Sequence, residues 1–183
     1  MARQVLFVHG AGGGAYAEDA KLVEGLREKL GSGYTVRYPM MPNEADPDYS
    51  VWKHAISREL ALMGDDAILV GHSIGGSVVI KVLADGDVGQ SIAGVFLIAA
   101  PFWHDHEVWR WNDVALPKDA AALLPRGIPV FLYHGRADEV VPFSHVEMYA
   151  RALPSAIVRR LDDRNHQLND DLTELAEDIK HLR

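Results

Sequence analysis

Residues 67–84 read AILVGHSIGGSVVIKVLA, and this stretch decides the fold. Its first four residues form an apolar run typical of a buried strand, and SVVIKVLA continues as a helical pattern. Between them, residues 71–76 (GHSIGG) match G-x-S-x-G, in which the glycines let a strand and a helix crowd around a sharp turn. The stretch therefore predicts a strand–turn–helix unit that presents Ser73 as a nucleophile, with the helix N-terminus favouring developing negative charge.

Similar apolar runs alternate with helical patterns along the rest of the chain. Several runs are apolar on both faces, as strands are when helices cover both sides of a sheet. We expect strands at residues 4–8, 34–38, 67–70, 92–99, 129–133 and 156–161, and helices near 18–30, 49–63, 74–85, 144–153 and 170–182. The last helix has Asn169 as its expected N-cap. This alternation predicts an α/β fold with a mainly parallel sheet and right-handed crossovers.

Length, charge and composition restrict the function classes. The chain has 183 residues, which suits a single domain over residues 1–183 with an insertion at 101–128. The net charge of −8 argues against nucleic acid or an anionic membrane as a partner, and no apolar run is long enough to span a bilayer. The absence of cysteine excludes a thiolate nucleophile and disulfides. We expect a cytoplasmic protein, and its oligomeric state is left open.

Two further segments supply the partners that a serine nucleophile needs. A serine hydroxyl is activated by a base, and the base is oriented by an acid. Residues 135–142 (GRADEVVP) follow the fifth expected strand, and residues 162–166 (DDRNH) follow the sixth. Because these loops leave the same edge of a parallel sheet, Ser73, Asp138 and His166 can meet there as nucleophile, acid and base.

In these features the chain resembles the α/β-hydrolases over nearly its whole length. The order Ser, Asp, His along the chain is the one that this fold uses. The pattern G-x-x-D-x-x-V-P around Asp138 resembles the family's acid loop, whereas the glycine often found just before the family's histidine is absent before His166. The resemblance implies a three-layer α/β/α sandwich with a six-stranded, mainly parallel sheet in the order 2-1-3-4-5-6. It also implies a small serine hydrolase with little or no cap.

Residues 10–15 (GAGGGA) raise a competing interpretation, because they satisfy the dinucleotide fingerprint G-x-G-x-x-G/A after a strand-like run. That fingerprint requires an acidic residue about 20 positions further on, at the end of the second strand. The first acids beyond that strand are Glu44 and Asp46, after two prolines. The spacing therefore disfavours a nucleotide site.

The resemblance implies a different role for this glycine loop. Acyl transfer forms an oxyanion that needs two N–H donors, and in the α/β-hydrolases one comes from the residue after the nucleophile, here Ile74. The other comes from the loop after the first strand, where residues 9–11 (HGA) resemble the family's H-G-x motif. This implies Ala11 as the second donor, with Gly12 as the alternative.

Other side chains compete for the acid and base roles. Glu139 is the alternative acid, although it is displaced by one position from the family pattern. His134 and His145 are alternatives to His166 as the base. Residues 104–107 (HDHE) contain an H-x-H pair that suits a metal, but such a pair on a polar loop is usually just solvated. We expect neither a metal nor an organic cofactor.

The substrate-binding candidates lie on the same loops. They are Gly12, His72, Phe102, Trp103, Trp109 and Trp111. The aromatic rings of the insertion either line a substrate site or anchor the insertion to the body, and the sequence leaves both interpretations open.

The sequence thus predicts an enzyme, a carboxylesterase-like serine hydrolase acting on a small ester, or a related thioester or amide, through an acyl-enzyme. The alternatives are an acyltransferase, thioesterase or cofactor-free perhydrolase that uses the same three residues. A noncatalytic binding protein on the same fold is the alternative from another class.

Overall fold

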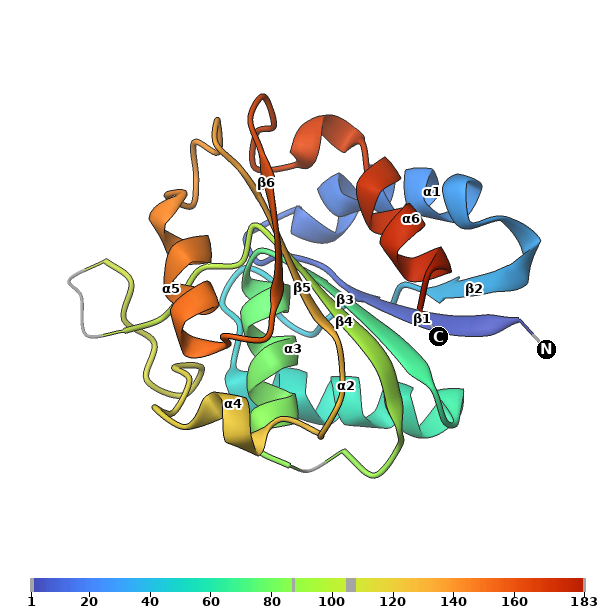
Figure 1. Cartoon of the computed structure of the whole chain (residues 1–183), viewed down its shortest axis with the longest axis horizontal. Helices are drawn as coiled ribbons and strands as arrows, with labels where there is room; N and C mark the ends of the chain where they lie inside the picture. The colour runs from blue at the N-terminus through green and yellow to red at the C-terminus, as the bar shows by residue number, and fades with distance from the viewer. Residues whose placement is uncertain (1, 87, 105–107, 183) are drawn as a thin grey trace.

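The structure, a computed structural model, describes residues 2–86, 88–104 and 108–182. In these residues six strands form one sheet in the order β2-β1-β3-β4-β5-β6, and every neighbouring pair is parallel (Figure 1). The strands are β1 (Arg3–Val8), β2 (Tyr34–Arg37), β3 (Ala67–His72), β4 (Ile92–Ile98), β5 (Val130–Gly135) and β6 (Ile157–Leu161). The predicted strand order is confirmed, and the described sheet is wholly rather than mainly parallel.

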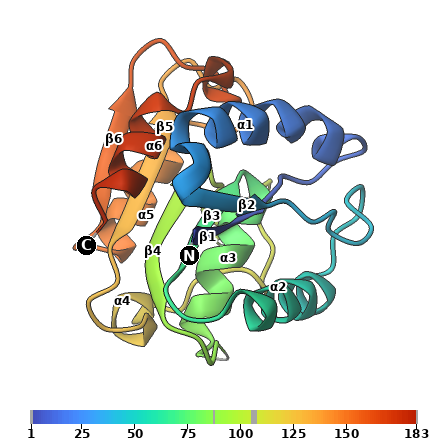
Figure 2. The same ribbon diagram turned by 90° about the vertical axis from the view of Figure 1, so that its right-hand side faces the viewer.

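Helices cover both faces of this sheet (Figure 2). The α-helices are α1 (Ala15–Leu30), α2 (Tyr49–Met63), α3 (Ile74–Ala84), α4 (Ala120–Leu123), α5 (Ser144–Ala152) and α6 (Thr173–Lys180), with 3₁₀ turns η1 (Gly31–Gly33) and η2 (Leu168–Asp170). The core shared by α1 and α6 lies on one face, and the core shared by α2 to α5 lies on the other. The predicted three-layer sandwich is therefore confirmed.

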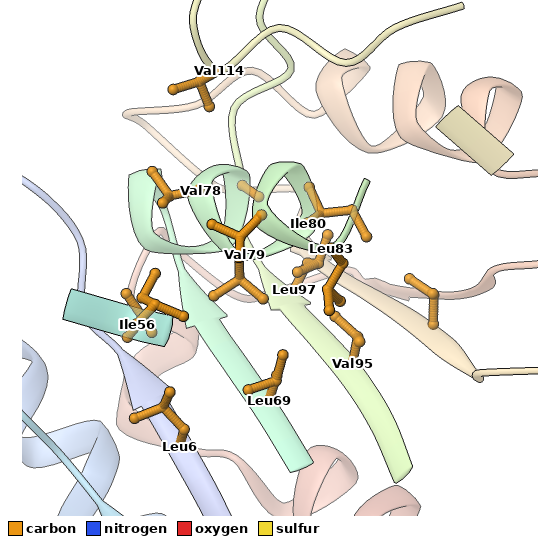
Figure 3. Close-up of a cluster of buried hydrophobic side chains, with 14 of the residues drawn as sticks. Leu6, Ile56, Leu69, Val78, Val79, Ile80, Leu83, Val95, Leu97 and Val114 are labelled. Carbon is orange, nitrogen blue, oxygen red and sulfur yellow. The ribbon is translucent and has the colours of Figure 1, made fainter. Parts of the chain in front are cut away.

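The two cores explain why the strands read as continuous apolar runs. Successive side chains of a strand point to opposite faces of the sheet. In β1, Val5 and Phe7 pack in the core under α1 and α6, whereas Leu6 and Val8 pack in the core under α2 and α3. Figure 3 shows this second core where α3 lies across β3 and β4. Both faces of the sheet are buried, so the residues that point to either face must be apolar.

The register of the strands brings the important loops to one edge of the sheet. Val8 at the end of β1 pairs with Gly71 of β3, and His72 of β3 pairs with Ile98 of β4. On the other side, Gly135 of β5 pairs with Leu161 of β6. The segments that follow these strands therefore leave the sheet together, next to the point between β1 and β3 where the strand order reverses.

The start of the last helix differs from the expectation, since α6 begins at Thr173 and Asn169 is not its cap. Asn169 lies in η2 with φ 56°, and its side chain accepts a hydrogen bond from the backbone N–H of Asn165. The carboxylate of Asp171 accepts hydrogen bonds from both the N–H and the hydroxyl of Thr173 instead. The predicted helix is present, but the polar residues at its expected start form a separate turn.

The segment at residues 101–128, expected as an insertion, contains the short helix α4. Its role as a lid, and the interpretation of residues 1–183 as one domain, stay predictions. Across the part of the chain that the structure describes, every helix is too short or too polar to cross a bilayer.

Candidate active site

Ser73 occupies a strained turn between β3 and α3. Its φ of 51° and ψ of −127° are unusual for a residue with a side chain, and such a conformation costs of order 1–3 kcal/mol. The glycines around it make the turn sterically feasible: a Cβ on Gly71 would lie 2.5 Å from Cα of Gly76, and one on Gly75 would lie 2.3 Å from the carbonyl oxygen of His9. This is the close strand–helix packing that the G-x-S-x-G pattern predicts.

Asp138 and His166 meet at the same edge of the sheet. Asp138 follows β5 and His166 follows β6, and Nδ1 of His166 lies 2.9 Å from Oδ2 of Asp138. The other carboxylate oxygen of Asp138 accepts hydrogen bonds of 2.8 Å from the backbone N–H groups of Val140 and Val141. Asp138 is thus held in one orientation, and it presents one oxygen to the His166 ring.

A second histidine shares this carboxylate. Nε2 of His134 lies 2.9 Å from the carbonyl oxygen of Val141 and 3.2 Å from Oδ2 of Asp138. Burial alone would raise the pKa of Asp138, but the hydrogen bonds from His134 and His166 outweigh burial and hold the pKa well below its usual range. His134 therefore holds the acid in place, and its Nε2, which carries a proton toward the Val141 carbonyl oxygen, is not available as a base.

The third contact of the proposed catalytic residues, between Ser73 and His166, is not a hydrogen bond in this structure. Among the described residues, the Ser73 hydroxyl makes no hydrogen bond to His166, although His72, the neighbour of Ser73, has its ring centroid 4.8 Å from that of His166. Hydrogen bonds of this kind are often long without substrate and tighten when substrate binds. The alternative acid Glu139 is exposed, whereas the side chain of Asp138 is buried against His134 and His166.

The glycine loop after β1 reaches the nucleophile. A Cβ on Gly10 would lie 3.3 Å from Cβ of Ser73. His9 is buried, and its Nε2 accepts a hydrogen bond of 2.8 Å from the N–H of Met41, so Nδ1 must carry the ring proton that it shares with the carbonyl oxygen of Gly10 at 2.6 Å. Burial lowers the pKa of His9, which keeps this neutral form.

These contacts separate the two oxyanion candidates. The N–H of Gly12 donates to the carbonyl oxygen of Glu44 at 2.7 Å, whereas the N–H of Ala11 has no such acceptor among the described residues. Because a trans peptide directs its C=O and N–H to opposite sides, holding the Gly10 carbonyl on His9 also orients the Ala11 N–H. Ile74 begins α3, so its N–H has no acceptor within the helix.

The first turn of α1 is already occupied by a carboxylate. The side chain of Glu44 accepts hydrogen bonds of 2.9 Å from the N–H of Gly14 and 2.7 Å from the N–H of Tyr16. In a dinucleotide site a pyrophosphate takes this place at the helix N-terminus. The geometry therefore argues against a dinucleotide site for a physical reason, because the anion that the loop binds belongs to the chain itself.

His72 lies at the end of β3, directly before Ser73, and it is buried. Its side chain is 2% exposed, and both ring nitrogens contact protein atoms, Asp19 Oδ2 at 2.8 Å and the carbonyl oxygen of His166 at 3.1 Å. Its expected role as a substrate-contacting residue does not fit this burial. It lies behind Ser73 and joins the elbow to the His166 loop.

The aromatic residues of the insertion lie together beside α5. Ring centroids of Trp103 lie 5.8 Å from Trp109 and 5.5 Å from Trp111, and the N–H of Phe102 donates to Nδ1 of His145 at 2.8 Å. Phe102, Trp103 and Trp111 also pack against the core of that face. His145 is thereby committed to the insertion rather than to the base role, and contact of the rings with substrate stays a prediction.

The expected alternative of a metal site involves Asp105, His106 and Glu107, which lie outside the described residues. Within residues 2–86, 88–104 and 108–182, no group of three His, Cys, Asp or Glu side chains has the arrangement to hold a metal ion.

Comparisons with known proteins identify the family and the fold. Residues 19–175 match the sequence model of the family described as serine hydrolase. A search of curated proteins returned no significant match. Among solved structures, Est1E of Butyrivibrio proteoclasticus has a TM-score of 0.72 at 19% identity, with 98% of this chain and 86% of that chain covered.

Two other structures are similar over nearly the whole chain. A meta-cleavage product hydrolase of Pseudomonas fluorescens IP01 has a TM-score of 0.76 at 17% identity and covers 100% of this chain and 92% of its own. The ydeN gene product of B. subtilis has a TM-score of 0.74 at 17% identity and covers 98% and 97%. These similarities show the fold, which is that of the α/β-hydrolases.

Proposed function

The chain belongs to the serine hydrolase family, and we propose that it cleaves a small carboxylic ester, or a related thioester or amide, with Ser73, His166 and Asp138. The observation that carries the proposal is the hydrogen bond of 2.9 Å between Nδ1 of His166 and Oδ2 of Asp138, at the edge of the sheet where the strained Ser73 turn lies. The chain thereby combines a nucleophile on an elbow with an oriented base, which is the requirement for acyl transfer.

The reaction proceeds through an acyl-enzyme. Nε2 of His166 takes the hydroxyl proton as Oγ of Ser73 attacks the carbonyl carbon, and the N–H groups of Ala11 and Ile74 bind the oxyanion. When the tetrahedral intermediate collapses, the His166 proton passes to the departing oxygen. Water then gives a proton to His166 and attacks the acyl group, and the proton returns to Ser73 as the acid product leaves.

The electrostatics of the site suit this sequence of steps. Asp138 stays ionised at neutral pH because its pKa is held low by the hydrogen bonds from His134 and His166, which outweigh the effect of burial. The carboxylate keeps the Nδ1 proton of His166 in place, so Nε2 is free to accept the Ser73 proton, and it stabilises the imidazolium that forms. The neutral His9 fixes the peptide that carries the Ala11 donor.

The substrate side of the proposal rests on the insertion. Phe102 and the three tryptophans follow β4, whose carboxyl end neighbours the end of β3 at His72. Half-buried aromatic rings at this edge favour an apolar acyl or alcohol group of modest size. The ester is therefore expected to be small and apolar.

A panel of p-nitrophenyl esters of increasing acyl length tests the proposal. The wild type should release p-nitrophenol at a rate that depends on the acyl length of the ester, and Ser73→Ala should lose nearly all of this hydrolysis rate. Ser57→Ala is the matched control, because the Ser57 hydroxyl bonds to a carbonyl oxygen within α2, away from the site. If a fluorophosphonate fails to label Ser73 in the folded protein, the proposed nucleophile is wrong.

A further inference from the structure

A second acid–histidine pair lies behind the nucleophile. Asp19 of α1 and His72 of the elbow have side chains that are each 2% exposed, and Oδ2 of Asp19 lies 2.8 Å from Nδ1 of His72. The mechanism proposed above uses neither side chain. A buried ionisable pair is costly unless its hydrogen bonds are complete, so its presence at this place needs a reason.

The pair connects three loops of the site. Oδ2 of Asp19 also accepts a hydrogen bond of 2.9 Å from the N–H of Gly10, which precedes the Ala11 donor. Its Oδ1 accepts one of 3.2 Å from the amide of Gln167. Nε2 of His72 lies 3.1 Å from the carbonyl oxygen of His166. The oxyanion loop, the elbow and the base loop are thus joined through two side chains.

The partners determine where the protons are. A carbonyl oxygen accepts hydrogen bonds only, so Nε2 of His72 must donate to His166. Nδ1 of His72 lies 2.8 Å from Oδ2 of Asp19, so one proton must lie between these two atoms, and the opposite pKa shifts of the two groups place it on His72. For Asp19, burial raises the pKa, but the charge and hydrogen bond of His72 outweigh it and lower the pKa. For His72, burial lowers the pKa, and Asp19 outweighs it and raises the pKa.

Resting on the function proposed above, we propose that the Asp19 carboxylate and the His72 imidazolium form a buried positioning pair that holds Gly10 and the backbone of His166 in register with Ser73. The pair touches no reacting atom. It sets the direction of the Ala11 N–H through Gly10 and the place of the base through the His166 carbonyl oxygen.

The surrounding charges balance when the base becomes protonated. The titratable groups that face His72 are Asp19 from α1, His9 from the end of β1, Asp138 after β5 and His166 after β6. His9 is neutral, as its contacts require. When His166 becomes an imidazolium during catalysis, the site holds two cations, His72 and His166. Two carboxylates, Asp19 and Asp138, balance these charges, so the charge of His72 does not oppose protonation of the base.

An amide at position 19 cannot replace the carboxylate. With its oxygen placed where Oδ2 lies, Asp19→Asn accepts from Gly10 but leaves the His72 imidazolium without a counter-ion. With its nitrogen placed there, it donates to a neutral His72 but directs an N–H at the N–H of Gly10. Either arrangement loses the charge of His72 or the bond that holds the oxyanion loop.

Two variants of His72 separate its two contacts. In His72→Asn the amide nitrogen falls near the former Nδ1 position, which keeps a bond to Asp19 and loses the bond to His166. In His72→Gln the amide reaches the former Nε2 position, which keeps the bond to His166 and weakens the one to Asp19. These variants also serve if Asp19→Asn does not fold.

The first test does not depend on turnover. Nitrogen-15 NMR of the histidine rings at pH 7 should find both nitrogens of His72 protonated in the wild type. In Asp19→Asn, either His72 should lose a ring proton or amide exchange at Gly10 should quicken. Asp178→Asn is the matched control: Asp178 lies in α6, on the same face of the sheet as α1, and it accepts hydrogen bonds from Tyr133 and Arg159. A singly protonated His72 ring in the wild type overturns the proposal, and so does an Asp19→Asn variant that keeps both His72 ring protons and the wild-type exchange rate at Gly10.

The second test is kinetic. With p-nitrophenyl acetate, Asp19→Asn should lower kcat at least ~10-fold with KM nearly unchanged, because loosening an oxyanion donor weakens transition-state binding. Asp178→Asn should keep the wild-type kcat. Equal kcat values for the two variants overturn the positioning role. If the wild type itself cleaves no ester, the proposed function fails, while the NMR and exchange results still decide whether the pair holds the two loops.

Discussion

The sharpest prediction concerns Asp138→Asn, because the hydrogen bonds of Asp138 determine how an amide must sit in its place. Oδ1 accepts from the N–H groups of Val140 and Val141, which are donors only, so the amide oxygen must take this position. The amide nitrogen then takes the place of Oδ2 and donates to Nδ1 of His166. His166 is thereby forced into the tautomer that carries its proton on Nε2, which cannot accept a proton from Ser73.

The size of the effect follows from this change of tautomer. A wrong tautomer with the geometry otherwise intact lowers kcat by about 10⁴-fold, which corresponds to about 5 kcal/mol of transition-state stabilisation. The stability cost is smaller. The new amide N–H groups also face Nε2 of His134, which still bonds to Val141 at 2.9 Å, so we expect a loss of about 1 kcal/mol. In a chain of this length that lowers Tm by about 2–4 °C.

The assay is steady-state hydrolysis of a p-nitrophenyl ester by the wild type, Asp138→Asn and Glu139→Gln, with Tm measured on the same samples. Glu139→Gln is the matched control, since this exposed neighbour undergoes the same chemical change and should keep the wild-type kcat. Retention of more than about a tenth of the wild-type kcat by Asp138→Asn, at a Tm close to that of the wild type, would refute the assignment of Asp138 as the orienting acid.

Two further predictions concern stability. Gly75→Ala should destabilise the fold by at least about 3 kcal/mol, because the added Cβ would lie 2.3 Å from the carbonyl oxygen of His9, whereas Gly13→Ala, with open space around it, should be nearly neutral in urea unfolding. Folding raises the pKa of His72 above its ordinary value of 6.5, so the stabilising contribution of His72 is complete below pH 6.5 and declines as pH rises through the folded pKa. Asp19→Asn should remove this part of the pH dependence of the unfolding free energy. An unchanged profile of unfolding free energy against pH would contradict the charged pair.

The fold and the three proposed residues were predictable because their signals are local. A buried strand, a glycine pair around one serine and a following helix fit within residues 67–84, and the strained turn at Ser73 is the physical result of that pattern. Asp138 and His166 each follow a strand directly. Parallel strands deliver such loops to one edge, so strand order alone brings them near Ser73.

The supporting residues could not be found in the same way. Asp19 lies within the amphipathic stretch of α1, where an acidic residue normally faces solvent, and His134 reads as a polar end to β5. Their roles depend on contacts between residues far apart in the chain, such as Asp19 with His72. Only one local signal existed for Asp19: its position puts it on the same helix face as buried Leu22, Val23 and Leu26.

The glycine loop shows why a matching pattern can mislead about chemistry. Glycines before a helix expose backbone N–H groups that require an anionic or carbonyl acceptor, and the fingerprint records only these donors. In a nucleotide-binding protein, the phosphate of the ligand is this acceptor. Here Glu44 supplies it, with a carbonyl oxygen for Gly12 and a carboxylate for Gly14 and Tyr16. Among the described residues, the N–H of Ala11 is left without a backbone acceptor, so the residue that closes the loop to a phosphate leaves Ala11 as the proposed oxyanion donor.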